Sequence, residues 1–513
     1  MTRDILLGLD VGTSSTNSVI ADASGKILGQ GSMAYGQLTP RPGWVEQNPE
    51  WYIDGVKNSA AQALKASGRK WSDVCGLSLT HQRLTCIPVD ESGSPVYSAI
   101  VWNDTRCTEE VQWATEAIGA EVIFRRTGYT PGIWTVYKVL WLKKNRPDIY
   151  EKTHQIHMVS DWLIHGLTGE AVTSYGTAVT SGVLDLNAKH RWDTELLKQF
   201  GLREDIFIQD IRPSGEIVGK VKKDAEALFG IPEGIPVVLA AGDQPCGCLG
   251  AGQFEKGTLS VNGGTACTCE TLVAEIPALR HPNYFVEISP SGDYIMENSI
   301  YSGVSALVKW YNDKFEPFPK KNKNNKWDTI QEMAAGAPVG NLGLIMIPFF
   351  GGSGAPYWNM DARGALLGLT EDHGKGHVLR AIIEGLAYEA KKESDLMAKD
   401  SSDTLKRLIT YGGSNPIWNQ TLANVFNKPL DAVSIADTNA LGAAMCAAAG
   451  VGIYEDVTSA GKAMAPEVTT YAPEEKAVVF YDALYREVYE GLYDSIEEKL
   501  ALGRRLALEF DGE

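Results

Sequence analysis

Short apolar stretches that end in small polar residues alternate with longer amphipathic stretches along this chain. The first apolar stretch, residues 5–10, predicts a buried strand, and the glycine-containing turns after it predict a three-stranded meander over residues 5–31. Apolar residues that recur every three or four positions predict helices, among them 135–145 and 375–398. Strands that alternate with helices in two similar halves indicate an α/β fold with mixed sheets.

One strand–turn–strand pattern occurs twice. In the first half an apolar strand ends in Asp10 and runs into Gly12-Thr13-Ser14, and in the second half residues 259–262 run into Gly263-Gly264-Thr265. Glycine lets backbone N–H groups approach an anion, and threonine adds a hydroxyl donor. Asp10 is placed to hold Mg²⁺ through its waters. Two such phosphate loops predict a nucleotide held between two related domains.

The length of 513 residues is too great for one core and predicts two domains. A buried strand at 237–241 stops at Gly242-Asp243-Gln244-Pro245, and a small-residue helix is expected from there toward Gly252. The second phosphate loop follows at once. We therefore place the predicted boundary between residues 1–252 and 253–513.

Composition narrows the classes of partner. The 47 basic and 64 acidic residues give a formal charge of −17, which argues against nucleic acid or an anionic membrane surface. There is no apolar leader, and the small-residue run 440–451 is too short for a membrane span. The eight cysteines do not form a disulfide scaffold, and their two C-x-C pairs favour packing over zinc. The expectation is a cytoplasmic, reduced protein.

Two common nucleotide-binding motifs are missing. The chain contains no G-x4-G-K-S/T sequence and no convincing G-x-G-x-x-G at the end of a strand. A P-loop enzyme and a Rossmann dehydrogenase are therefore disfavoured.

Two long gapped patterns carry a family resemblance. One is Thr135-x-x-Lys138-Val139-x-Trp141-Leu142-x-Lys144-Asn145, and the other is Gly364-x-Leu366-x-Gly368-Leu369 followed by His377-Val378-x-x-Ala381-Ile382-Ile383-Glu384. Together with the phosphate loops they resemble the FGGY carbohydrate kinases over nearly the whole chain. The resemblance implies two actin-like ATPase (ribonuclease H-like) domains with mixed sheets flanked by helices. It also implies ATP and Mg²⁺ as cofactors and a small sugar or polyol as substrate.

Asp243 is the candidate catalytic base. Phosphoryl transfer to an alcohol needs a base near the attacking hydroxyl, and Asp243 stands in a turn at the end of a buried strand. The alternative on the residues alone is a helix N-cap, whereas the resemblance makes the Asp of Gly-Asp-Gln the base. The predicted metal residues are Asp10 and Asp243. The predicted ATP-binding residues are Gly12, Thr13, Ser14, Gly264, Thr265, Gly412 and Gly413.

The predicted acceptor wall combines features of two branches of the family. Residues 101–104 and 43–49 resemble the xylulokinase branch, whereas His81-Gln82-Arg83 resembles the glycerol kinase branch. The latter branch expects Glu where Leu84 stands, Tyr near Ile133 and Phe near Thr268. A ketopentose such as xylulose is therefore the expected substrate, with glycerol or a tetritol as alternative. The predicted substrate-binding residues are Gln82, Arg83, Trp102, Asn103, Asp104 and Gln244.

Two other classes of function remain open at this stage. An actin-fold ATPase without a sugar acceptor would lack a polar acceptor wall, and a non-catalytic sugar sensor would not need Asp10, Thr13, Asp243 and Thr265 together. The charged amphipathic segment 474–505 is expected to be a helix that either covers the core or meets a second copy of the chain, which leaves a homodimer open.

Overall fold

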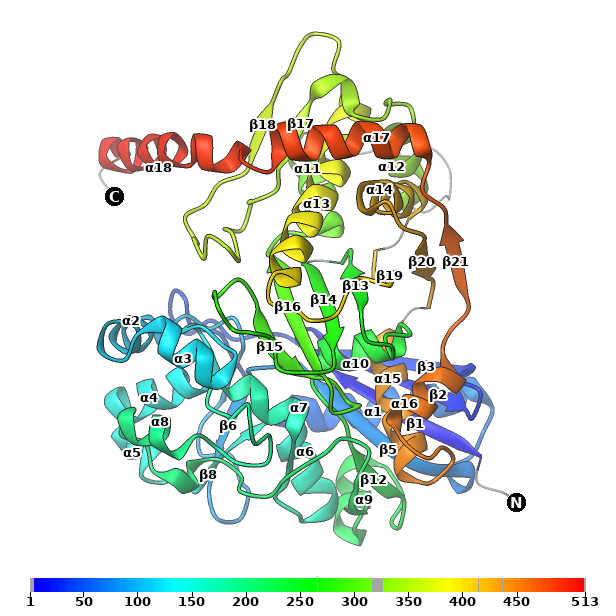
Figure 1. The fold of residues 1–513 in the computed structure, drawn as a ribbon. Helices are drawn as coiled ribbons and strands as arrows, with labels where there is room; N and C mark the ends of the chain where they lie inside the picture. The colour runs from blue at the N-terminus through cyan, green and yellow to red at the C-terminus, as the bar shows by residue number, and fades with distance from the viewer. Residues whose placement is uncertain (1–3, 265, 316–325, 414, 436, 512–513) are drawn as a thin grey trace. The chain divides into compact units, whose positions relative to one another are not determined.

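The computed structural model describes residues 4–264, 266–315, 326–413, 415–435 and 437–511 (Figure 1). Contacts between Cα atoms group the chain into two compact units. Unit 1 comprises residues 1–254, 272–295 and 437–466, and unit 2 comprises 255–271, 296–436 and 467–513. The first division lies after residue 254, and two later segments, 272–295 and 437–466, return to unit 1. The division into 1–252 and 253–513 stays a prediction.

Unit 1 is built on a six-stranded mixed sheet whose order is β11-β12-β5-β1-β2-β3. The hairpins β1–β2 and β2–β3 are antiparallel, which confirms the predicted meander, while β1, β5 and β12 run parallel. The strands are β1 (Ile5–Val11), β2 (Ser15–Asp22), β3 (Ile27–Ala34), β5 (Val74–His81), β11 (Ile217–Lys220) and β12 (Pro236–Leu239).

The alternation along β1 decides what each face of this sheet covers. Ile5, Leu7, Leu9 and Val11 belong to one buried cluster with residues of α1 (Glu50–Ser67). The intervening positions face α15 (Thr438–Gly450), where a Cβ at Gly8 would overlap the Ala440 carbonyl oxygen. Glycine there lets α15 lie directly on the strand, so that Asp10 comes close to the start of this helix.

A smaller antiparallel sheet and several helices complete unit 1. The sheet has the order β4-β7-β6-β8, with β4 (Glu46–Gln47), β6 (Cys86–Val89), β7 (Ala99–Ile100) and β8 (Gln155–Met158). Strand β7 ends at residue 100, because residues 102–104 turn away. The remaining strands are β9 (Thr173–Ser174), β10 (Ile211–Arg212) and β15 (Phe285–Ile288). The helices are α2 (Thr108–Ala117), α3 (Ala120–Thr127), α4 (Thr135–Asn145), α5 (Pro147–Tyr150), α6 (Val159–Thr168), α7 (Tyr175–Ala178), α8 (Thr194–Gln199), α9 (Lys223–Phe229), α10 (Asp243–Gly250) and α16 (Val457–Met464).

Unit 2 repeats the same strand pattern. An antiparallel hairpin, β13–β14, is followed by the parallel strands β19 and β20, and β21 closes the edge antiparallel to β20. This repetition, with helices flanking both mixed sheets, confirms the predicted fold class. The strands are β13 (Thr258–Asn262), β14 (Cys267–Val273), β16 (Tyr294–Ile300), β17 (Ile345–Ile347), β18 (Ala365–Leu367), β19 (Arg407–Tyr411), β20 (Leu430–Val433) and β21 (Val468–Tyr471).

The helices of unit 2 follow the predicted pattern except at the C-terminal end. The long helix predicted at 375–398 is present with those bounds, and Pro416 occupies the first turn of α14 behind the N-cap Asn415. The single helix predicted at 474–505 is instead α17, a π-helical turn over Tyr485–Tyr489 and α18. The π turn accompanies the burial of Tyr485, Tyr489 and Tyr493. The helices are α11 (Val304–Lys314), α12 (Lys326–Ala335), α13 (Lys375–Ala398), α14 (Pro416–Phe426), α17 (Glu475–Leu484) and α18 (Leu492–Asp511).

Among the residues that the structure describes, no helix combines the length and the apolar character that spanning a bilayer requires.

Candidate active site

The first phosphate loop closes the hairpin between β1 and β2. Gly12 N–H donates to the Ser15 carbonyl oxygen at 3.0 Å, and the Tyr35 hydroxyl donates to the Gly12 carbonyl oxygen at 2.6 Å. Thr13 Oγ1 accepts from Trp102 Nε1 at 2.9 Å, whereas Ser14 is exposed. The loop is thus fixed by side chains from other parts of unit 1 and presents its outer face to solvent.

Asp10 lies at the end of β1 and is almost fully buried. Its Oδ2 accepts from Asn439 Nδ2 at 3.2 Å, and its buried Oδ1 has no hydrogen-bond partner among the described residues. Burial raises the pKa of this carboxyl well above its ordinary value, and the nearby charges of Asp437 and Asp243 raise it further. An unpartnered buried oxygen among carboxylates favours a cation at this position.

Two helices begin beside Asp10. Asp437 caps α15 by accepting the Ala440 N–H at 2.8 Å, and burial raises the pKa of Asp437 to about 6. Asp243 is the first residue of α10, which packs against α15 so closely that a Cβ at Gly442 would overlap the Cys246 carbonyl oxygen. Both helix starts offer partial positive charge, which suits phosphate groups.

Asp243 is held by its own helix and by Arg83. Its Oδ1 accepts from Arg83 Nε at 3.1 Å and from the Gln244 N–H at 2.9 Å. Burial raises the pKa of the Asp243 carboxyl, while the Arg83 charge lowers it. A carboxylate with a raised pKa at a helix start is suited to take a proton from an alcohol. Gln244, the next residue of α10, is half-buried.

Arg83 also contacts a second carboxylate, that of Glu287 on β15. Arg83 Nη1 donates to Glu287 Oε1 at 2.6 Å, and the Tyr129 hydroxyl donates to the same oxygen. The Glu287 side chain is 1% exposed and that of Arg83 is 13% exposed. The stem of Arg83 crosses the start of α10 at Gly242, where a Cβ would lie 2.4 Å from Arg83 Cγ. Arg83 therefore joins Asp243 to Glu287.

The other predicted substrate residues differ in how accessible they are. Trp102 is 41% exposed, and the buried Oδ1 of Asn103 has no hydrogen-bond partner among the described residues. Gln82 is buried, and its Nε2 donates to Gln47 Oε1 at 2.9 Å and to the Tyr52 hydroxyl at 3.2 Å. Trp102 is consequently the accessible candidate, whereas Asn103 Oδ1 and Gln82 Oε1 are both buried and have no hydrogen-bond partner among the described residues.

Asp104 is occupied by contacts within the protein. Arg106 Nε donates to its Oδ1 at 2.8 Å, and Arg106 Nη2 donates to its Oδ2 at 2.7 Å. The Val45 N–H donates to the same Oδ2. Because both carboxylate oxygens are bound, we interpret Asp104 as an anchor for the 101–104 turn. A direct substrate contact of Asp104 remains a prediction.

Two residues of the first family pattern, Thr135 and Lys138, bind the backbone of the turns that carry the predicted substrate-binding residues. Lys138, buried in α4, donates from Nζ to the Leu84 carbonyl oxygen at 3.0 Å and to the Trp102 carbonyl oxygen at 3.3 Å. Thr135 Oγ1 donates to the same Leu84 oxygen at 3.1 Å. Leu84 adopts a φ of 67°, a conformation that is costly for leucine and that these bonds help to hold. Lys138 therefore joins the Arg83–Leu84 turn to the Trp102 turn.

The second phosphate loop lies in unit 2 beside the Gly412-Gly413 turn. Gly264 N–H donates to Asn262 Oδ1 at 2.9 Å, and Gly263 N–H donates to the Tyr411 carbonyl oxygen at 3.1 Å. Gly412 and Gly413 have φ values of 60° and 66°, and a Cβ at Gly413 would lie 2.3 Å from the Gly263 carbonyl oxygen. Only glycine fits this close approach without strain. Thr265 lies outside the described residues.

The carboxylates near the first phosphate loop suit Mg²⁺ bound through waters. No group of three or more Asp, Glu, His or Cys side chains spaced to share a metal occurs in the described part of the chain. Asp10 and Asp243 are nevertheless close enough to influence each other's charge, and Asp10 Oδ1 lacks a partner. Mg²⁺ commonly uses one or two carboxylates together with waters and substrate phosphates. The donor set fits that mode of binding.

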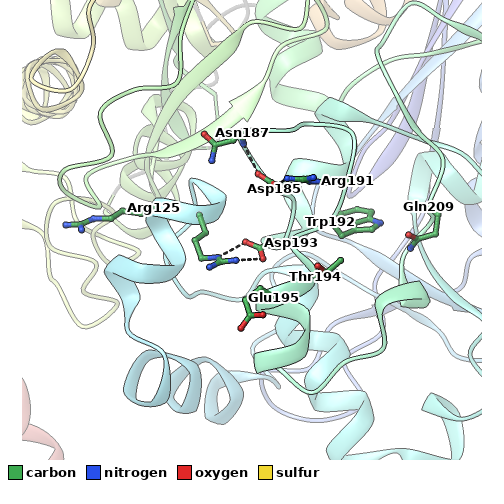
Figure 2. A pocket seen from close by; sticks show the side chains of 10 residues that line it. Arg125, Asp185, Asn187, Arg191, Trp192, Asp193, Thr194, Glu195 and Gln209 are labelled. Carbon is green, nitrogen blue, oxygen red and sulfur yellow. Dashed lines mark hydrogen bonds and ion pairs between the residues drawn. The ribbon is translucent and has the colours of Figure 1, made fainter.

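A separate polar cavity of about 690 Å³ lies in unit 1, lined by residues of α3, α8 and the loop between residues 185 and 193 (Figure 2). Its Arg126 side chain is paired with Asp193 through two bonds of 2.6 Å, and Arg191 is paired with Asp185. It contains none of the predicted site residues. Its paired charges give no reason to assign it to the reaction.

Sequence reasoning missed Glu287 altogether, and it named Lys138 in the first family pattern without giving it a role. Glu287 and Lys138 are single charges in otherwise apolar stretches, 284–288 and 136–142, and a lone charge of that kind is a recognisable signal. Tyr129, Asp437 and Asn439 carried no such signal, because their roles depend on neighbours that are distant in sequence.

Comparison with known proteins identifies the family. The model of the N-terminal domain of the FGGY family of carbohydrate kinases matches residues 5–250, and that of the C-terminal domain matches residues 257–451. A xylulose kinase of Lactococcus lactis is 26% identical over 96% of this chain and 97% of its own. A glycerol kinase of Thermococcus gammatolerans is 32% identical over 88% and 90%.

Solved structures agree on the fold. The ligand-bound xylulose kinase from Lactobacillus acidophilus superposes with a TM-score of 0.85 at 24% identity, covering 97% of this chain and 98% of that one. A gluconate kinase from the same organism gives the same TM-score and identity over 96% and 98%. At this identity the likeness establishes the two-domain fold. With both domain models matched, the chain belongs to the FGGY family of carbohydrate kinases and is an ATP-dependent carbohydrate kinase.

Proposed function

We propose that this kinase transfers the γ-phosphoryl group of ATP to a hydroxyl of a small sugar, and that a ketopentose such as xylulose is its preferred acceptor. The observation that supports the proposal most is the contact between Asp243 and Arg83 at 3.1 Å. It joins the candidate base to the only residue of the predicted acceptor wall that carries a positive charge.

In the proposed mechanism Asp243 accepts the proton of the attacking hydroxyl as that oxygen bonds to the γ-phosphorus. The phosphorus–oxygen bond to ADP breaks in the same step. Arg83 orients Asp243, and its charge lowers the pKa that burial raises, which favours the ionised carboxylate. Asp10 and Asp243 would hold Mg²⁺ through waters, and the ion supplies charge neutralisation on the phosphates when bound.

The residues proposed to bind ATP belong to both units. The backbone N–H groups around Gly12 and Thr13 in unit 1 would bind phosphate oxygens, as would those around Gly264 and Thr265 in unit 2. The Gly412-Gly413 turn, which leaves no room for side chains, would accept the adenosine. The helix starts at Asp243 and Asp437 add a favourable field for the anion.

We propose a ketopentose because of the side chains that the predicted acceptor wall offers to the substrate. Trp102 is accessible and Asn103 Oδ1 has unused accepting capacity among the described residues, whereas Leu84 offers no side-chain acceptor for a polyol hydroxyl. A buried hydroxyl left unpaired costs about 1–3 kcal/mol. A polyol such as glycerol or a tetritol is the second candidate, because Arg83 resembles the glycerol kinase branch and several relatives are glycerol kinases.

A coupled assay of ADP release tests this proposal. Xylulose, ribulose, fructose, glycerol and erythritol would each be titrated at saturating ATP and Mg²⁺. We expect acceptor-dependent ADP release with the highest kcat/KM for a ketopentose. A kinetic preference for glycerol over every ketose would contradict the ketopentose assignment and favour the polyol alternative.

A further inference from the structure

Glu287 is the feature of the candidate site that the proposed reaction does not yet use. We propose that Glu287 is a specificity-determining positioning residue. It fixes Arg83 against Asp243 and makes the acceptor subsite selective for neutral sugars over sugar acids. The inference rests on the proposed function, because it concerns the acceptor of the same reaction.

The placement of Glu287 is specific. It projects from β15 into a cluster whose other members come from the turn after β5 and the turn after α3, and it is separated from Arg83 by 204 positions. One of its oxygens accepts from both Arg83 Nη1 and the Tyr129 hydroxyl. Two donors on one oxygen hold the carboxylate at a defined position, and it in turn sets the plane of the guanidinium.

The charges around Arg83 explain the selectivity. One guanidinium contacts two carboxylates, Asp243 at 3.1 Å and Glu287 at 2.6 Å, so its positive charge is shared between them. A free arginine would attract the carboxylate of an aldonic acid, and a shared one does not. Like charges at such separations in a partly buried site repel strongly, which corresponds to at least about a 100-fold loss of affinity for an anionic acceptor.

Tyr129, which holds Glu287, is itself fixed by aromatic neighbours. Its ring stacks on Phe285 with centroids 5.5 Å apart and an interplanar angle of 18°, and it meets Trp134 edge-on at 5.3 Å. Tyr129 and Phe285 are buried, so this packing fixes the hydroxyl that donates to Glu287.

Steady-state kinetics with Glu287→Gln and Glu287→Asp test the inference. The acceptors are xylulose and glycerol on the neutral side and xylonate and gluconate on the acidic side, with the KM for ATP measured in parallel. In the wild type, kcat/KM for the acids should be at least about 100-fold below that for the best neutral acceptor. In Glu287→Gln the KM for the neutral acceptor should rise about 10-fold, and the preference over the acids should shrink by a similar factor. Glu287→Asp should restore part of the preference.

A matched control is available in unit 2. Glu384 accepts from Arg380 Nε at 2.8 Å and from the Tyr481 hydroxyl at 2.7 Å, the same three residue types in the same arrangement. Glu384→Gln should lower the melting temperature without changing the ratio of kcat/KM between neutral and acidic acceptors. Thermal unfolding of all variants shows which of them fold.

Binding measurements separate this inference from the proposed function. Calorimetric titration of the wild type and Glu287→Gln with xylulose and gluconate, in the presence of ADP, reports acceptor choice without turnover. If xylulose binds but no ADP is released in the kinetic assay, the proposed function fails while the selectivity can still be read. The inference is overturned if a folded Glu287→Gln variant keeps the wild-type ratio of kcat/KM between neutral and acidic acceptors, if Glu384→Gln changes that ratio equally, or if neither ligand binds the wild type.

Discussion

Two buried clusters in this kinase contain the same three residue types but differ in what else the arginine contacts. In unit 1 Arg83 reaches Glu287 and also Asp243, and its cluster draws on three distant parts of the chain. In unit 2 Arg380 and Glu384 lie one turn apart on α13, and Arg380 donates to the Ala337 carbonyl oxygen and the Tyr481 hydroxyl. We interpret the unit 2 cluster as support for the fold and the unit 1 cluster as part of the reaction site, because only the unit 1 cluster contains the candidate base Asp243.

The largest expected effect falls on Asp243, the carboxylate that the unit 2 cluster lacks. Asp243→Ala should reduce kcat for the acceptor by about 10²–10⁴-fold, because the proton of the attacking hydroxyl loses its base. The KM for ATP should change little, since the phosphate loops remain. Steady-state kinetics with circular dichroism as a folding control measure both. Near-normal turnover in the folded variant would remove Asp243 from the mechanism.

The second effect concerns stability in unit 2. Glu384→Ala leaves the Arg380 guanidinium buried without its carboxylate and should lower the free energy of unfolding by about 3–5 kcal/mol. Urea unfolding measures this change. If the acceptor preference of the folded fraction shifted as well, the distinction between the two clusters would be wrong.

The third effect concerns Lys138, which holds two turns of the predicted acceptor wall. Lys138→Met removes a charged donor from the Leu84 and Trp102 carbonyl oxygens and should cost about 1.5–3 kcal/mol of stability. Because both carbonyls belong to the acceptor wall, the KM for the sugar should rise while the KM for ATP stays near its wild-type value. An equal rise in both constants would indicate a general loss of structure.

The smallest expected effect concerns a buried carboxylate that has no arginine partner, and the pH dependence of stability that its raised pKa causes. Asp161, in α6, has no ion pair among the described residues, and burial raises its pKa to about 7. The folded state therefore keeps a proton that the unfolded chain, with a pKa near 3.9, releases, so stability falls as the pH rises from about 4 to 7.

Asp161→Asn is neutral at every pH and removes this dependence. Relative to the wild type, the variant should gain about 1–3 kcal/mol between pH 5 and pH 8. Urea unfolding of both proteins at the two pH values gives this difference directly. An unchanged difference would mean that Asp161 is ionised in the folded protein throughout this range.

Local patterns predicted much of the fold. The meander over residues 5–31 and the helices at 135–145 and 375–398 follow from apolar spacing and from turn residues, which act over a few positions. The single helix expected at 474–505 was less well predicted, because packing interrupts it near Tyr489.

The site could be predicted only in part. Asp10, Asp243 and the glycine turns stand in short motifs, so their positions were recognisable. The partnership of Arg83 with Glu287 spans 204 positions and depends on how β15 packs within unit 1, which no local pattern encodes. Asp104 shows that a motif can also suggest too much. Its motif suggests a ligand contact, but Arg106, two positions away, binds both of its carboxylate oxygens.

The fate of the γ-phosphoryl group tests the central claim most directly. ATP labelled with ³²P at the γ position would be incubated with the wild type and xylulose, and the products separated by chromatography. We predict that the label moves to a sugar phosphate in the wild type and that Asp243→Ala abolishes this transfer. Label found only in inorganic phosphate, with or without any sugar or polyol, would show that the protein hydrolyses ATP and would contradict the assignment of unit 1 as an acceptor site.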